Sequence, residues 1–190
     1  ERIPGRMKFF STLKAERCLT QLLSERDPAS PEGRKALESL RSIGPEAIPK
    51  VIEAFATADK EHSGAMVTLL ASLLDDKTFP LFTAGLGHTD KLCVAGVTKA
   101  LAISANYDTN RLTELLGRPE IFKPALIEIL GIVRKRLNAR ELLKRAYDLE
   151  PREKAAVFKI IGDIAGPDLV PDLIARIEGK DPSVRLNIIE

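Results

Sequence analysis

Residues 44–55 read GPEAIPKVIEAF, and residues 166–177 repeat this pattern as GPDLVPDLIARI, with both prolines in register. Between these two copies, related segments recur at steps of 31, 30, 30 and 31 residues, namely KTFPLFTAGL, TNRLTELLG and ARELLKRAY. A repeat of 20–50 residues indicates an array of similar units, each of which buries its apolar face only against its neighbours. The repeat therefore predicts a solenoid.

Each unit also contains an upstream segment with apolar residues at helical spacing. These segments are GRKALESLRSI (33–43), GAMVTLLASLL (64–74), KLCVAGVTKALAI (91–103), FKPALIEILGIV (122–133) and REKAAVFKIIGDI (152–164). Apolar residues at i, i+3, i+4 and i+7 are typical of amphipathic helices, and no stretch keeps the strict alternation of a strand. The sequence therefore predicts an all-α fold of helix pairs.

The prolines fit the junction between the two helices of a pair. Pro45 and Pro167 follow a helix end and cannot continue that helix. Pro49 and Pro171 fall in the first turn of the next helix, where a missing N–H costs nothing. Acidic residues beside them, namely Glu46, Asp168 and Asp172, suit the positive end of that helix. The repeated motif thus marks helix boundaries and carries no chemistry of its own.

On these residues, GPEAIPKVIEAF, GPDLVPDLIARI and the closing DPSVRLNIIE (181–190), the chain resembles bacterial HEAT-like repeats. The resemblance covers about residues 31–190 and is weakest in the third and fourth units, which lack the proline. It implies a right-handed α-solenoid of about five antiparallel helix pairs, of HEAT or armadillo type, with the second helices lining the concave side. A solenoid needs polar caps at its ends, and residues 7–26 are expected to form an N-terminal capping helix.

The expected organisation follows from the repeat. We assign residues 1–30 to the capping helix and its loop, and residues 31–179 to five helix pairs. The pairs are expected at about 31–58, 62–88, 90–117, 120–148 and 151–179. Residues 180–190 are expected to begin a truncated sixth repeat, so we expect the chain to be a fragment of a longer protein.

Composition narrows the class further. The formal net charge is +2 and 29% of residues are charged, which gives no whole-chain argument for nucleic acid or membrane. No apolar run approaches the length of a bilayer span, so we expect no membrane insertion. Lys14, Glu16 and Arg17 interrupt the segment that would otherwise resemble a signal peptide. Cys18 and Cys93 form no metal or redox motif and suit a reduced compartment, so we expect a cytoplasmic protein.

Candidate catalytic and metal-binding residues are sparse. His62 and His88, the two histidines, lie near predicted inter-helix loops and are interpreted as solvated loop residues. A metal site needs three or four converging ligands, and a nucleophilic site needs an oriented base. The acidic pair Asp75 and Asp76 falls at a predicted turn and is interpreted as a helix-terminus feature. We therefore expect no catalytic residues, no metal and no cofactor.

One segment departs from the even charge balance. Residues 111–145 carry nine basic and four acidic residues, whereas residues 146–190 carry six basic and nine acidic residues. Arg136, Arg140 and Lys144 recur at i+4 spacing and are predicted to share one helical stripe. The candidate basic patch adds Arg134, Lys135 and Arg145. It could be a solvated face, a contact for an acidic partner or a site for nucleic acid; base-stacking aromatics are nearly absent, which makes nucleic acid the weakest of the three.

The sequence favours a non-catalytic scaffold that binds a protein partner, or another domain of its own chain, through the concave face. Projecting the repeat onto the second helices gives eight candidate partner contacts: Lys50, Glu53, Arg111, Glu114, Arg140, Lys144, Asp172 and Arg176. Two alternatives stay open. One is a cofactor-handling protein similar to the HEAT-like phycobilin lyases, since fold alone does not exclude it. The other is a weak nucleic-acid binder that uses residues 111–145.

Overall fold

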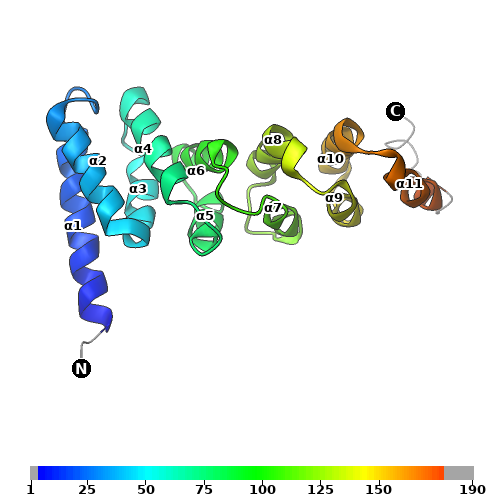
Figure 1. The fold of residues 1–190 in the computed structure, drawn as a ribbon, viewed down its shortest axis with the longest axis horizontal. Coiled ribbons are helices and arrows are strands. Elements are labelled where there is room, and N and C mark those ends of the chain that lie inside the picture. Colours follow the sequence, from blue (N-terminus) through cyan, green and yellow to red (C-terminus); the bar gives the residue numbers. More distant parts are fainter. Residues whose placement is uncertain (1–3, 178–190) are drawn as a thin grey trace. The chain divides into compact units, whose positions relative to one another are not determined.

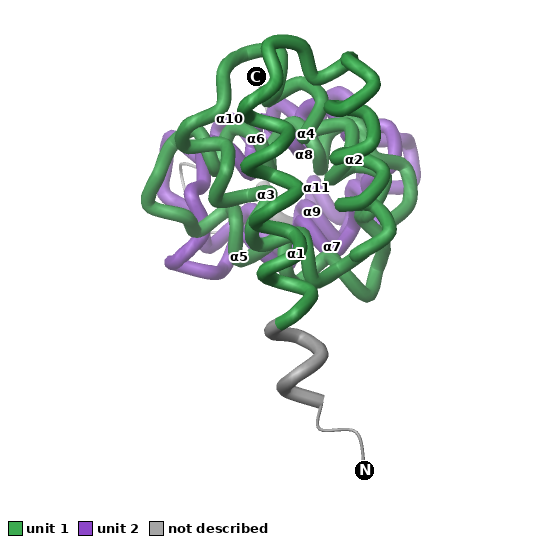
Figure 2. The backbone as a smooth tube through the Cα atoms, turned by 90° about the vertical axis from the view of Figure 1, so that its left-hand side faces the viewer, with its two compact units in different colours: residues 1–107 green, residues 108–190 purple. Residues whose placement is uncertain are grey.

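The computed structural model describes the backbone of residues 4–177 and the side chains of residues 10–175. Every regular element between residues 4 and 177 is a helix, so the predicted all-α fold is confirmed. The chain divides into two compact units, unit 1 of residues 1–107 and unit 2 of residues 108–190 (Figure 2).

Unit 1 contains six α-helices and one short 3-10 helix within its described residues. They are α1 (Pro4–Ser24), α2 (Pro31–Ile43), the 3-10 helix η1 (Gly44–Ala47), α3 (Ile48–Ala54), α4 (Lys60–Leu73), α5 (Phe79–Leu86) and α6 (Lys91–Ile103). Local side chains begin several of these helices: Ser30 caps α2, Asp59 caps α4 and Asp90 caps α6, each accepting a backbone N–H of the first turn.

The helices of unit 1 pack in two rows. α1 packs against α3, and α3 packs against α5, whereas α2 packs against α4, and α4 packs against α6 (Figure 1). The rows also contact each other, through α1 with α2, α3 with α4 and α5 with α6. The core between the rows is mainly aliphatic, with Leu40, Val51, Met66 and Leu101 fully buried. This arrangement exposes one side of each helix to solvent.

Unit 2 begins with the short helix α7 (Arg111–Glu114) and ends, within the described residues, with α11 (Val170–Ile177). Between them lie η2 (Leu115–Gly117), α8 (Lys123–Val133), η3 (Arg134–Arg136), α9 (Ala139–Ala146), α10 (Pro151–Ile164) and η4 (Pro167–Leu169). α7 packs against α8 and α9, and α10 packs against α8 and α9. Figure 1 shows α7, α9 and α11 in one row of this unit and α8 and α10 in the other.

The proline junctions form as predicted. Pro45 follows the end of α2 within η1, and Pro49 is the second residue of α3. Pro167 begins η4, and Pro171 is the second residue of α11. Pro80 holds the same place in α5. The five upstream segments also form helices, namely α2, α4, α6, α8 and α10.

One sequence prediction about the helices is wrong. Arg136 was expected to share a helical stripe with Arg140 and Lys144, but it ends η3, and the chain is extended at Leu137 and Asn138 before α9 begins. The Asn138 side chain accepts the backbone N–H groups of Arg140 and Glu141, at 3.0 and 3.3 Å, and so starts a new helix. Only Arg140 and Lys144 share the stripe on α9.

Candidate functional site

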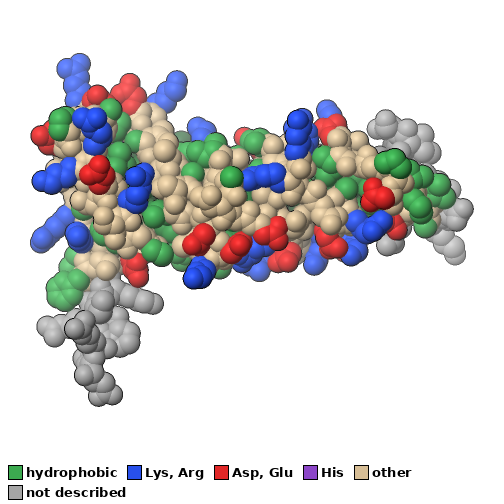
Figure 3. All heavy atoms as spheres, viewed as in Figure 1, with side chains coloured by type: hydrophobic (Ala, Val, Ile, Leu, Met, Phe, Trp, Pro, Cys, Tyr) green, Lys and Arg blue, Asp and Glu red, His purple; other side chains and the backbone are tan. Residues whose placement is uncertain are grey.

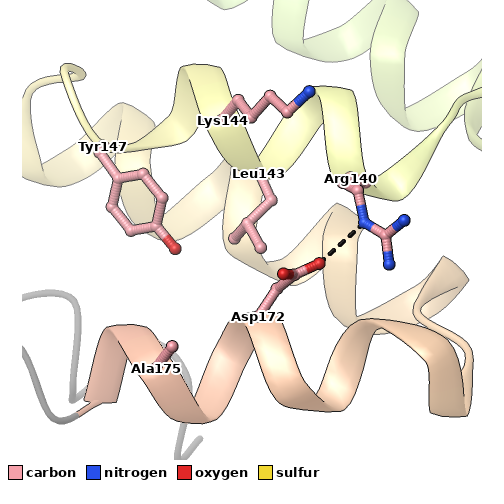
Figure 4. Close-up of a pocket in the computed structure, with 6 residues that line it drawn as sticks. All are labelled: Arg140, Leu143, Lys144, Tyr147, Asp172 and Ala175. Carbon is pink, nitrogen blue, oxygen red and sulfur yellow. Dashed lines mark hydrogen bonds and ion pairs between the residues drawn. The ribbon is translucent and has the colours of Figure 1, made fainter.

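The groove between α9 and α11 in unit 2 contains three of the predicted partner contacts. It encloses about 380 Å³, within the size range of small ligand pockets. Its lining residues are Arg140, Leu143, Lys144 and Tyr147 from α9 and its C-terminal end, and Asp172 and Ala175 from α11 (Figure 4). We call this the α9/α11 groove.

The local sequence explains how α9 presents these side chains. Leu142, Leu143 and Ala146 are buried and fix the helix against its neighbours. Arg140 and Lys144 are spaced by one turn and project on the exposed side. On the facing helix, Pro171 fixes the first turn of α11, and Asp172 follows it at the end where a carboxylate is stabilised by the helix dipole.

An ion pair crosses the groove. Arg140 Nε donates to Asp172 Oδ2 at 2.8 Å, and Arg140 Nη2 donates to the backbone carbonyl of Asp168 at 3.1 Å. The Asp168 carboxylate lies 3.9 Å from the same nitrogen. Arg140 therefore ties α9 to the start of α11. Because both charged groups are about half exposed, the pair is worth only about 0.2–1 kcal/mol.

Lys144 does not join this ion pair. Its Nζ donates to Glu141 Oε1 on the same helix at 2.7 Å, and this hydrogen bond lowers the pKa of Glu141 below its ordinary value. Figure 4 shows the Lys144 side chain extending away from α11. The groove thus has a rim of both charges, and the face drawn in Figure 3 likewise mixes basic and acidic side chains.

The floor and wall of the groove are apolar. Leu143 is buried, and the Tyr147 ring packs edge to face on Phe158 with ring centroids 6.0 Å apart. Ala175 is the apolar lining residue from α11. Val170 and Ile174 of the same helix are about half exposed, at 46% and 51%, but do not line the groove. Sequence reasoning missed Leu143, Tyr147 and Ala175 as groove residues. The spacing of Leu143 and Tyr147, one turn apart beside Lys144, was the available signal.

The other predicted partner contacts lie elsewhere. Lys50 and Glu53 are on α3 of unit 1, where Lys50 Nζ lies 2.9 Å from Glu53 Oε2 and 3.1 Å from Glu16 Oε1 of α1. The hydrogen bond to Glu53, followed by the one to Glu16, raises the pKa of Lys50. Arg111 and Glu114 are on α7 and do not line the α9/α11 groove. Arg176 is on α11, but its side chain lies outside the described residues, as does the predicted sixth repeat at 180–190.

The candidate basic patch is divided between η3 and α9. Arg134, Lys135 and Arg136 form η3, whereas Arg145 is on α9. Arg134 Nη1 donates to the Gly131 carbonyl at 2.8 Å, and Arg134 Nε lies 3.4 Å from Asp163 Oδ2. The patch is therefore partly balanced by acidic groups of its own unit.

The prediction for His62 is wrong. His62 lies in the first turn of α4 and is only 3% exposed, with Nδ1 2.8 Å from Asp59 Oδ1. The reason is the helix cap: Asp59 accepts the backbone N–H of His62 at 2.9 Å, so α4 starts at Lys60 and turns residue 62 inward. The same backbone hydrogen bond is the main reason that the pKa of Asp59 is lowered. His88 does lie in a loop, where its Nδ1 accepts the Asp90 N–H at 3.0 Å.

The remaining candidate chemistry has structural explanations. Asp75 occupies the turn before α5 and accepts the backbone N–H groups of Lys77 and Thr78, at 2.9 and 2.8 Å. The Thr78 hydrogen bond lowers the pKa of Asp75. Cys18 and Cys93 are both free thiols, and burial raises the pKa of Cys93. Among the described residues, no three His, Cys, Asp or Glu side chains cluster as metal ligands.

No protein-family model matches the chain, and no curated protein matches it. The class of protein is therefore defined only by the fold and the groove. It is an all-α protein of helices packed against their neighbours, with an exposed groove between α9 and α11. None of the helices in the described part of the chain is both long and apolar enough to cross a membrane.

Proposed function

We propose that this protein is a non-catalytic scaffold of the HEAT-like type that binds a protein partner, or another domain of its own chain. In this proposal the helix pairs build a right-handed solenoid capped by α1, and the second helices α3, α5, α7, α9 and α11 line its concave face. The two rows of helices within each unit support this arrangement. The helix-pair bounds and a cytoplasmic location belong to the same proposal, the latter supported by the two free cysteines.

The α9/α11 groove is the observation that carries the proposal. It gathers Arg140, Lys144 and Asp172, which come from two successive units of the sequence repeat, beside the apolar side chains of Leu143 and Tyr147. A mixed polar rim around an apolar floor is the composition expected of a protein interface. Weak exposed ion pairs add specificity without fixing the surface permanently.

Cross-linking from the groove tests the proposal. A photoreactive amino acid replaces Lys144 in the chain, and a matched variant carries it at Lys159, which is exposed on α10. We expect one partner to cross-link from position 144 and not from position 159, and the purified partner to bind the unmodified chain. The same products from both positions would contradict the proposal.

Charge reversal then tests the contribution of the rim. Arg140→Glu with Lys144→Glu should weaken binding of that partner by about tenfold or more, because both cations of the rim are replaced by carboxylates. The matched control, Arg152→Glu with Lys159→Glu on α10, should change binding less than about twofold. Equal affinity for both double variants would exclude the α9/α11 groove as the contact.

The nucleic-acid alternative is less well supported. Of the nine basic residues between 111 and 145, Arg134, Arg140 and Lys144 already contact carboxylates of unit 2. Lys123 Nζ donates to the Leu115 carbonyl at 3.2 Å and to the Arg118 carbonyl, and burial lowers the pKa of Lys123. These cations are not presented together to a phosphate backbone. A salt-dependent gel shift with duplex or single-stranded DNA would revive this alternative.

A further inference from the structure

A second groove lies in unit 1, between α4 and α6, and it is separate from the proposed α9/α11 binding surface. It encloses about 440 Å³ and is lined mainly by small or apolar residues. Those residues are Phe55, Ala58, Ser63, Gly64, Val67, Leu92, Ala95 and Gly96, with Asp59, Lys60 and Lys99 at the rim. We call this the α4/α6 groove.

Two glycines shape this groove in different ways: Gly96 allows close packing, and Gly64 leaves open space. A Cβ at Gly96 would lie 2.5 Å from the Phe55 ring, so the glycine lets α6 approach that ring closely. A Cβ at Gly64 would meet no atom within 4 Å and would project into open space. Leu92, by contrast, is 56% exposed at the edge of the groove. The groove thus offers uncovered apolar surface beside helices that are otherwise well packed.

The groove runs along two helix turns, with one lysine near each end. α4 and α6 run in the same direction, because Ser104, directly after α6, donates to the Ala71 carbonyl near the end of α4 at 3.1 Å. The lining spans residues 60–67 of α4 and 92–99 of α6, about 10 Å along each helix. Lys60 stands at the start of this length and Lys99 at its far end.

The two lysines make the rim net positive. Neither Lys60 nor Lys99 has an ion pair within the described chain. The nearby Asp59 carboxylate is engaged by the backbone N–H and ring of His62. The rim carries a net charge of +1, with Asp59 beside Lys60 and no rim carboxylate beside Lys99. An apolar floor with a lysine near each end is complementary to an apolar side chain flanked by carboxylates.

We propose that the α4/α6 groove binds a short acidic–apolar–acidic segment of a partner protein. The apolar side chain lies over Gly64, Val67 and Leu92, and the flanking carboxylates contact Lys60 and Lys99. A sequence of two glutamates, two leucines and two glutamates meets this description and serves as the probe.

Fluorescence anisotropy with this labelled hexapeptide, at low salt, tests the proposal. We expect saturable binding that weakens as salt is added, because exposed ion pairs are screened. A peptide with lysines in place of the glutamates, and one with serines in place of the leucines, should each bind at least about fivefold more weakly. No saturable binding, or equal affinity for the three peptides, would overturn the proposal.

Matched variants locate the site. Lys99→Glu should weaken the probe by about fivefold or more, whereas Lys91→Glu, which changes the same charge on α6 outside the lining, should change it less than about twofold. Gly64→Leu fills the groove and should abolish binding, whereas Thr68→Leu, one turn further along α4, should not. If Gly64→Leu disturbs the fold, as judged by circular dichroism, the variants of the exposed Lys99 and Lys91 still test whether the probe binds in the α4/α6 groove. Equal effects of those two lysine variants would refute the assignment.

Discussion

The two copies of the proline-containing segment form the same local structure but are packed to different extents. Ile52, eight residues after Gly44, is 4% exposed in α3, whereas Ile174, eight residues after Gly166, is 51% exposed in α11. α3 packs against α1, α4, α5 and α6, which together cover its apolar side. The sequence pattern therefore specifies the helix and its first turn, whereas the degree of burial depends on which helices pack around it.

A second difference lies six residues after each glycine. Lys50 of the first copy bonds to Glu16 of α1, and Asp172 of the second copy bonds to Arg140 of α9. Each side chain reaches another helix of its own unit, but the charges are exchanged. Both copies therefore form an inter-helix ion pair at this position, although the residue there is basic in the first copy and acidic in the second.

The largest expected effect on stability is the difference between truncating Ile52 and truncating Ile174. Ile52→Ala should lower the free energy of unfolding by about 2–5 kcal/mol, because it leaves a cavity among well-packed neighbours. Ile174→Ala should cost less than about 1 kcal/mol, since half of that side chain is already in water. Urea titration followed by circular dichroism measures both. Equal losses would show that Ile174 is as well covered in solution as Ile52.

The next effect concerns the glycine that opens each copy. Gly44 has φ 76° and ψ −140°, a conformation that side-chain-bearing residues rarely adopt, so Gly44→Ala should cost about 1–3 kcal/mol. Gly166 has φ −96°, and a Cβ there would meet chiefly the movable end of the Asp168 side chain. Gly166→Ala should therefore change the free energy of unfolding by about 0.5 kcal/mol or less. A larger loss at Gly166 than at Gly44 would contradict this reading of the two junctions.

These differences show what the sequence could predict. The helical periodicity and the prolines were sufficient for the all-α fold and for placing Pro49 and Pro171 in the first turns of α3 and α11, because both depend on local sterics. The inward turn of His62 was missed because it depends on the Asp59 cap, which moves the start of α4 to residue 60.

The candidate site was predictable only in part. Repeat projection selected Arg140, Lys144 and Asp172, since all three lie on successive second helices of the repeat. It could not predict which carboxylate pairs with each cation, because Lys144 pairs with a residue of α9 and Arg140 pairs with a residue of α11. Repeat projection also left out Tyr147, whose spacing from Leu143 indicates the side of α9 on which it lies, whereas its packing against Phe158 is a tertiary contact.

A smaller effect is expected from the ion pair of the second copy. A double-mutant cycle with Arg140→Ala and Asp172→Ala should give a coupling of about 0.3–1 kcal/mol at low salt, because the pair is exposed. The coupling should decrease toward zero at about 1 M salt, where the screening length is about 3 Å. Thermal unfolding of the four proteins measures it. A coupling that survives high salt would mean that Arg140 and Asp172 are shielded from water.

The smallest effect belongs to the corresponding ion pairs of the first copy. The pKa of Lys50 is raised in the folded state, chiefly by its hydrogen bond to Glu53, so its contribution to stability is fully present below the unfolded-state pKa and is lost as pH rises through the folded value. The Tm difference between the unmodified protein and Lys50→Met should stay constant from about pH 7 to about pH 9.5, and it should shrink above the usual lysine value of about 10.4. The corresponding free energy of stabilisation should be a few tenths of a kcal/mol, because the carboxylates of Glu16 and Glu53 are exposed. A Tm difference that instead shrinks on acidification through about pH 6 would assign the effect to a group other than Lys50. Of the two copies, only the second would then have an inter-helix ion pair that contributes to stability, through Asp172.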